Sequence, residues 1–476
     1  MIRRAQHVES RSVLVALLAS SLAIAVGVVT PVAPSAWIVI AAPFAVVALC
    51  VSPYLRLGFV VLGGVIILGP AEFTTWKLIY MGGLLVCVVV ALPSLLGQER
   101  VLPKEVRRLV DLSAVGAVLL CLPAVYRLAS GTDPTSVLRD LSPYVLLAVA
   151  PLLALDAAPR LSLRRLSEIA GIGLGFGSVA FLLSWSVRRG FIGGLGDTTL
   201  FGAMFLPVAL LVLSCVCFIE ARQNARVLWL VLAGLAAAAA IVTGTRSFIL
   251  EIPAVLVAVG MTGANAGSRM GRVVLVSAVV VIAGAFLVAL VILLTGSDAQ
   301  SIGDRWSLLL SAIANPGGDQ SLASRAAQTE VAWRLFLSSP IFGVPTGVGI
   351  PLAGSDPSGD TPVALLAGYG ISGLAAFVAF MMGWIGLVSR RCLGEKWPRT
   401  AMIGLIVAAF TFALILPIIQ DKGLGFSFLL VGAPVIRTLL DSQVEGHEPE
   451  PGREAFELRA IGSQPSHRPQ RQGLQP

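Results

Sequence analysis

Charged residues are scarce in this 476-residue chain, because only 13% of them are Asp, Glu, Lys or Arg, whereas 56% are hydrophobic. In an ordinary soluble protein about a quarter of the residues are charged. Histidine is almost absent as well, since His7, His447 and His467 are the only three and all lie near the ends of the chain. This distribution excludes a histidine base or a histidine-ligated metal site in the body of the protein.

Cysteine is missing from the longest polar stretch, residues 295–361. Five cysteines fall in apolar runs and one in a short polar segment: Cys50, Cys87, Cys121, Cys215, Cys217 and Cys392. A disulfide or a cysteine-based metal site is therefore excluded in that stretch. The chain also contains no P-loop, HExxH or GxSxG pattern, so it carries no signature of an ATPase or a serine hydrolase.

Long apolar runs take the place of the missing charge. A run of about 20 apolar residues can cross the roughly 30 Å hydrocarbon core of a bilayer as a helix, whose backbone groups are satisfied internally. We predict about fourteen such spans (twelve to fourteen): residues 12–29, 37–52, 57–70, 78–96, 109–125, 141–157, 166–186, 198–219, 226–243, 247–263, 273–294, 363–388, 400–419 and 424–440. The predicted fold is an all-α polytopic membrane bundle over residues 1–440, followed by a disordered cytoplasmic tail at 441–476.

The distribution of Lys and Arg predicts how these spans are oriented. With a cytoplasmic N-terminus, most basic residues fall in loops on the inner side, as the positive-inside rule requires. Both termini are then cytoplasmic, and the long loop of residues 295–361 lies outside. The net charge of +8 is attributed to anchoring at the inner face, so no nucleic-acid partner is expected. The first run is interpreted as an uncleaved helix, because no convincing cleavage site follows it.

The outer loop is predicted to contain one short amphipathic helix, residues 324–338. Ala327, Val331, Leu335 and Ser338 share a stripe, Glu330 and Arg334 form an i,i+4 pair, and Pro340 stops the helix. The following loop, residues 342–349, is rich in glycine, which permits close approach of the backbone. A helix beside such a loop, over a helical bundle, is typical of a cavity for a lipid headgroup.

Several arginines stand on the outer side, against the charge bias. Arg188 and Arg189 precede span 198–219, Arg246 lies in the tight turn 243–247, and Arg305, Arg325 and Arg334 lie in the long loop. Guanidinium suits bidentate binding of phosphate, so these residues are candidate diphosphate ligands; the alternative is anchoring at lipid headgroups. Glu251, just over one turn into span 247–263, is a candidate because a carboxylate at that depth needs a partner; a purely structural partner on another helix is the alternative.

Three segments resemble the O-antigen ligase and polymerase superfamily of bacterial envelope glycosyltransferases. The stretch 189–199, which includes Asp197, is similar to that family's outer Arg-x-x-Gly stretch, and 244–246 is similar to its Gly-(Ser/Thr)-Arg turn. The long loop is similar through Arg325, Trp333, Pro340–Gly343, Asp360–Thr361 and Gly370–Gly373. The ligase- and polymerase-like region covers about 188–390. Many ligases have His-Asn where this chain has Asp360–Thr361, which favours a polymerase-like or divergent member.

The resemblance implies that glycans are transferred or polymerised from an undecaprenyl-diphosphate carrier onto a glycan or lipid acceptor. The reaction would take place at the outer face of the bacterial cytoplasmic membrane, in envelope or exopolysaccharide synthesis. No cofactor and no metal are implied, since arginines can neutralise the diphosphate leaving group. Asp360 is the first candidate for the base that accepts the acceptor's proton, and Glu330 is the second. Membrane lipid and other polysaccharide-assembly proteins are the remaining partners expected.

Other interpretations stay open. A transporter or lipid-linked glycan flippase also has many spans, although such proteins tend to carry charges near the midplane and internal repeats, which this sequence lacks. A structural membrane partner is a third possibility. For Asp360, the alternative is that residues 359–362 simply start a helix, with Asp360 or Thr361 as its cap and Pro362 in the first turn. The sequence gives neither the sugar nor the acceptor.

Overall fold

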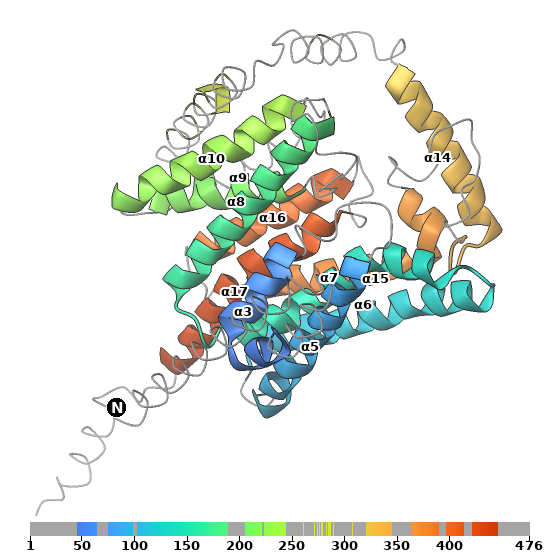
Figure 1. Cartoon of the computed structure of the whole chain (residues 1–476), viewed down its shortest axis with the longest axis horizontal. Helices are drawn as coiled ribbons and strands as arrows, with labels where there is room; N and C mark the ends of the chain where they lie inside the picture. Colours follow the sequence, from blue (N-terminus) through green and yellow to red (C-terminus); the bar gives the residue numbers. More distant parts are fainter. Residues whose placement is uncertain are drawn as a thin grey trace, which may run out of the picture.

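The computed structural model describes residues 45–63, 75–98, 102–188, 205–220, 223–243, 320–344, 363–389, 397–413 and 421–445, with a few separate positions between 260 and 307. Every regular element within these ranges is a helix (Figure 1). The elements are α3 (Pro53–Gly58), the π-helix η1 (Phe59–Gly63), α5 (Thr75–Gln98), α6 (Lys104–Ala129), α7 (Pro134–Ala157), α8 (Leu163–Arg188), α9 (Phe205–Glu220), α10 (Gln223–Thr243), α14 (Gln320–Ser338), α15 (Ala364–Val388), α16 (Trp397–Ala413) and α17 (Lys422–Glu445).

The helices follow the apolar runs of the sequence. Each predicted span from 78–96 to 226–243, and each from 363–388 onward, coincides with a helix. Among the residues that the structure describes, three helical segments are long and apolar enough to cross a membrane: Lys104–Ala129, Leu365–Val388 and Gly423–Ser442. The span predicted at 57–70 differs, because α3 starts at Pro53 and gives way to η1 at Phe59. α17 continues to Glu445, past the predicted end of the last span at residue 440.

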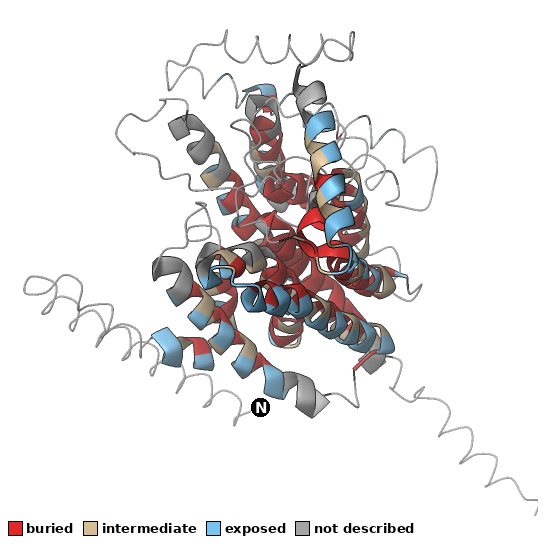
Figure 2. Ribbon diagram, turned by 90° about the vertical axis from the view of Figure 1, so that its right-hand side faces the viewer, coloured by how far each residue is buried: buried red, intermediate tan, exposed pale blue. Residues whose placement is uncertain are grey.

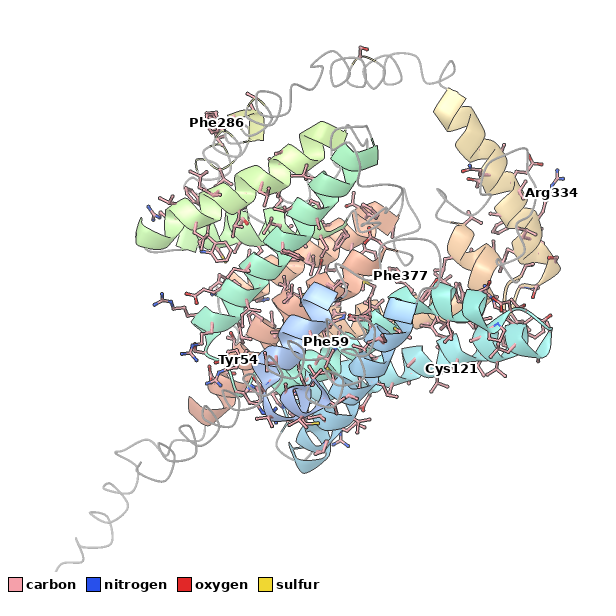
Figure 3. All side chains as sticks on the ribbon, in the orientation of Figure 1. Tyr54, Phe59, Cys121, Phe286, Arg334 and Phe377 are labelled. Carbon is pink, nitrogen blue, oxygen red and sulfur yellow. The ribbon has the colours of Figure 1, made fainter. Side chains whose placement is uncertain are left out.

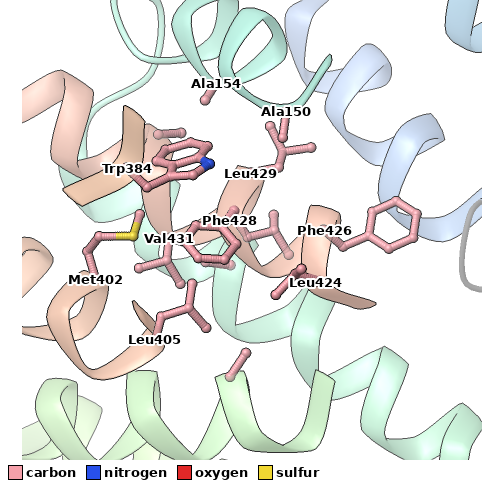
Figure 4. Packing of buried hydrophobic residues seen from close by; sticks show 14 of the residues in the cluster. Ala150, Ala154, Trp384, Met402, Leu405, Leu424, Phe426, Phe428, Leu429 and Val431 are labelled. Carbon is pink, nitrogen blue, oxygen red and sulfur yellow. The ribbon is translucent and has the colours of Figure 1, made fainter. Parts of the chain in front are cut away.

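The core lies where α15 packs on α6 and α17 packs on α7, the two most extensive pairings. Figure 2 shows buried residues gathered along the middle of the bundle. At its centre the fully buried Trp384 packs against Phe428 with tilted rings, 5.2 Å between ring centroids, beside Met402 (Figure 4). Gly432 faces this indole, and a Cβ there would lie 2.4 Å from its ring. Glycine at this position therefore lets α17 approach α15 closely.

A buried ion pair joins α3 to the end of α7. Arg56 donates from Nε (2.8 Å) and Nη2 (2.6 Å) to Oδ2 of Asp156, and both side chains are almost fully buried. Arg160 donates to the other carboxylate oxygen, and Arg56 also donates to the carbonyl of Leu49 at 2.6 Å. These bonds satisfy a charge that would otherwise be costly to bury. This end of the bundle is the one predicted to face the cytoplasm.

Candidate functional site

α15 is interrupted near its start by Gly370, whose backbone has φ 63° and ψ −158°. The interruption frees backbone groups of the helix, and the loop after α14 pairs with them. Ile371 N donates to the carbonyl of Pro340 (2.8 Å), and Val344 N donates to the carbonyl of Ala367 (2.8 Å). We call this meeting of Pro340–Val344 with Ala367–Ser372 the α14–α15 junction. In a membrane-crossing helix such freed groups must be satisfied within the protein, and here the loop satisfies them.

Two glycines make this approach possible. Gly343 has φ +72°, and a Cβ there would lie 2.4 Å from the carbonyl carbon of Gly368. Gly370 has φ +63°, and a Cβ there would lie 2.4 Å from the carbonyl carbon of Ile341. Each glycine thus faces the backbone beside the other, at a separation that no side chain tolerates. The predicted close approach of the glycine-containing loop is confirmed at Gly343.

A buried arginine closes the junction from the end of α6. The guanidinium of Arg127 donates to the carbonyls of Gly368 and Val344, the latter at 3.4 Å. It also lies over the ring of Tyr369, 4.4 Å from the centroid, and that ring packs against Tyr144 at 4.6 Å. A planar guanidinium suits this combination of carbonyl oxygens and an aromatic face. One charged side chain therefore binds both segments of the junction.

Arg127 was not among the site residues predicted from the sequence. Its only signal there is a basic residue at the outer end of a span, against the positive-inside bias. Arg127 is 1% exposed, and a buried charge at the end of an apolar helix is a functional candidate by default. Its partners cannot be read from the sequence, since Val344 and Gly368 lie more than 200 positions away.

α14 confirms that a helix covers residues 324–338 and ends before Pro340, although it begins earlier, at Gln320. The predicted stripe is not its buried face: Ala327 and Ser338 are exposed, Val331 and Leu335 are half-buried, and Ala332 is the buried residue among the side chains described. The predicted Glu330–Arg334 pair is present. Both side chains are largely exposed, 63% and 74%, and Arg334 points away from the bundle (Figure 3). The pair contributes about 0–1 kcal/mol to stability, as exposed pairs do.

The predicted phosphate ligands are only partly within the described residues. The backbones of Arg325 and Arg188 lie in α14 and at the end of α8, respectively. At 1.5 Å per residue, Arg325 lies about 20 Å along α14 from Ser338, so the structure does not bring it to the junction. Outside the described residues lie Asp360, Arg246, Arg189, Arg305, Asp197 and Glu251. α15 begins at Ala364, and its N-cap is Val363, which makes no side-chain capping bond.

A buried carboxylate ties two further helices together at the predicted outer end. Oδ2 of Asp421 accepts a hydrogen bond from the backbone N of Phe205, the first residue of α9, at 3.0 Å. Oδ1 accepts one from Gly423 N, in the first turn of α17, at 2.7 Å. A carboxylate beside two helix N-termini is favoured by the helix dipoles. Its signal in the sequence, an Asp directly before an apolar run, indicates the α17 cap but not the contact with α9.

Within the ranges that the structure describes, no three His, Cys, Asp or Glu residues lie close enough to hold a metal ion. No protein-family model matches the chain, and no curated protein matches it. The function is therefore inferred from the residues and the geometry given above.

Proposed function

We propose that this chain transfers or polymerises glycans from an undecaprenyl-diphosphate carrier at the outer face of a bacterial cytoplasmic membrane. The proposal includes a topology of about fourteen crossings with both termini in the cytoplasm. It is based on the resemblance of three segments to the O-antigen ligase and polymerase superfamily.

The observation that carries the proposal is the α14–α15 junction. The two segments that the resemblance links, Pro340–Gly343 and Gly370–Gly373, lie 27 positions apart in the sequence and hydrogen-bond to each other. An accidental similarity would not require these two segments to meet. Their contact, reinforced by Arg127, suggests that the spacing of the two motifs reflects a shared structural element.

The proposed reaction needs groups of two kinds. The acceptor hydroxyl oxygen forms a bond to the anomeric carbon of the donor sugar, and the bond from that carbon to the diphosphate oxygen breaks. The hydroxyl proton passes to a carboxylate, for which Asp360 is the first candidate and Glu330 the second. Arg246 and Arg325, with Arg188 and Arg189, neutralise the charge that develops on the departing diphosphate.

The length of α14 agrees with an extended substrate. Arg325 and the junction are separated by about 20 Å of helix, which is more than one diphosphate can bridge. A growing glycan that runs along the helix would contact both ends. A single site of phosphate chemistry near Arg325 and a second contact near the junction are therefore expected.

The positions of the buried charges favour this proposal over a transporter. Transporters tend to carry charged side chains near the middle of their spans. In the part of the chain that the structure describes, the buried charged side chains lie within a turn of a helix end: Arg56, Arg127, Asp156 and Asp421.

The test is the glycan profile of a strain that lacks the chromosomal copy and carries variants on a plasmid. Arg246→Ala and Arg325→Ala should abolish product while the protein level in the membrane stays normal, and Arg→Lys should restore only part of it. Arg164→Ala is the matched control, because Arg164 is 87% exposed at the predicted inner end and pairs only locally with Glu168.

The form of the defect identifies the reaction. Loss of long chains with intact repeat units indicates a polymerase, and loss of attachment indicates a ligase. Accumulation of lipid-linked repeat units on the inner leaflet would instead indicate a flippase. Normal glycan from both alanine variants would show that these arginines are anchors and would overturn the proposed diphosphate site.

A further inference from the structure

α14 and the turn after it expose large apolar side chains. Trp333 and Leu337 in α14 are 47% and 61% exposed, and Ile341, in the turn after Pro340, is 59% exposed. At about 100° per residue, Trp333 and Leu337 lie only about 40° apart around the helix, and together with Ile341 they are called the apolar flank. Exposed apolar side chains that stand singly need no explanation, but three in neighbouring positions do.

The polar side of α14 adjoins this flank. Glu330 lies about 60° and Arg334 about 100° around the helix from Trp333, and Arg334 points away from the bundle (Figure 3). Ala332, on a third side, is buried. α14 thus has a face against the protein, a polar face and an apolar flank between them. This division is typical of a helix that lies in a membrane interface.

The placement of α14 agrees with that position. In Figure 1 it runs crosswise to α6, and its lower end meets α15 and the end of α6 that carries Arg127. α6 and α15 are both long and apolar enough to cross a membrane. A helix that lies across the end of two membrane-crossing helices runs along the bilayer surface rather than through the bilayer.

The two membrane-crossing helices beside the apolar flank also expose apolar side chains. Along α15, Ile371, Leu374, Val378 and Met382 are exposed at helical spacing, and Val118, Leu122 and Val125 are exposed on α6. The backbone of Ile341 lies beside the start of the α15 row, because its carbonyl accepts a hydrogen bond from Ser372 N at 3.2 Å. The α14–α15 junction therefore brings the end of the apolar flank next to the exposed apolar row of α15.

We propose that α14 is an interfacial helix. The side chains of Trp333 and Leu337, with Ile341 in the turn that follows, lie among the lipids at the boundary between headgroups and acyl chains. Tryptophan is enriched at this depth because its ring is apolar and its N–H is polar. Glu330 and Arg334 face the headgroups and water. The partner is the bilayer itself, and the inference holds whether or not the proposed glycan transfer is correct.

The experiment measures the depth of spin labels on the full-length chain in vesicles of phosphatidylethanolamine and phosphatidylglycerol. Leu337→Cys and Trp333→Cys report on the flank, and Arg334→Cys is the matched control on the polar face of the same helix. The six native cysteines are replaced by alanine, and size-exclusion chromatography confirms that each variant is intact. Collisions with oxygen, which concentrates in lipid, are compared with those of a water-soluble nickel chelate.

At Leu337 and Trp333 the ratio of oxygen to nickel collisions should be several-fold higher than at Arg334. Equal ratios at the three positions would place the flank in water and overturn the proposal. Labels at Leu337 and Trp333 that neither reagent reaches would also overturn it, because a protein partner or a second copy would then cover the flank.

Discussion

Replacing Gly343 by alanine tests whether the α14–α15 junction depends on close backbone contact. An alanine at a left-handed φ costs about 1–2 kcal/mol in backbone strain alone. At Gly343 the new Cβ would lie 2.4 Å from the carbonyl carbon of Gly368, whereas ordinary contacts begin near 3.4 Å, so the segments must separate by about 1 Å. That movement breaks the 2.8 Å bond from Val344 N to the Ala367 carbonyl, at a further cost of about 1–3 kcal/mol. The expected total is about 2–5 kcal/mol.

The chain contains a matched control for the strain term. Gly131 has φ +82°, but nothing lies within 4 Å of the Cβ that an alanine would add, so Gly131→Ala costs only the 1–2 kcal/mol of strain. Thermal inactivation of both variants in detergent, followed by size-exclusion chromatography, gives the comparison. Gly343→Ala should lose its monodisperse peak at a clearly lower temperature than Gly131→Ala. Equal losses would refute the reasoning, because the contact across the junction would then contribute nothing.

Three further substitutions test other contacts. Arg127→Gln should destabilise the chain by about 2–3 kcal/mol in the same thermal assay, because the buried carbonyl of Gly368 and the partly buried carbonyl of Val344 lose a charged donor. A change below about 0.5 kcal/mol would remove Arg127 from the junction. Asp156→Ala should lower the stability of the chain by about 3–5 kcal/mol, because the charge of Arg56 is left buried without its partner. The control Glu168→Ala breaks an exposed pair and should lower the stability by only about 0–1 kcal/mol. Similar losses for the two variants would contradict the buried pair. Asp360→Asn keeps hydrogen-bonding capacity but removes the base, so glycan output should fall almost to zero at normal protein level, and normal output would exclude Asp360 from the mechanism.

Long apolar runs predicted most of the described helices, because a helix that spans a membrane can be recognised by its length and hydropathy alone. α14 and its stop at Pro340 followed from equally local signals, namely an i,i+4 ion pair and a proline. The span predicted at 57–70 starts later than α3 does, because Arg56 precedes the apolar run. In the structure the charge of Arg56 is buried, since Asp156 neutralises it from a helix 100 positions away, and α3 begins at Pro53.

The junction shows where local signals stop. The glycine-rich loop that includes Gly343 predicted close backbone approach, whereas Gly370 entered only through the resemblance at 370–373. Neither signal specified a partner, because the pairing is made by backbone atoms that every residue has. Arg127 was missed for the same reason: its acceptors are the carbonyls of Val344 and Gly368, which leave no trace in side-chain identity. Contacts between charged side chains within one helix could be predicted, whereas those that close the bundle depend on the three-dimensional arrangement.

The most direct test of the proposed function is transfer by the purified chain in vesicles that contain undecaprenyl-diphosphate-linked glycan and a glycan acceptor. Mass spectrometry measures the glycan product and the undecaprenyl diphosphate released. We predict that both appear together, with one undecaprenyl diphosphate released for each glycosidic bond formed, without added metal, and that both disappear in the Arg246→Ala and Arg325→Ala variants. Intact protein that moves the donor between leaflets without cleaving its sugar–diphosphate bond would contradict the account and identify a transporter.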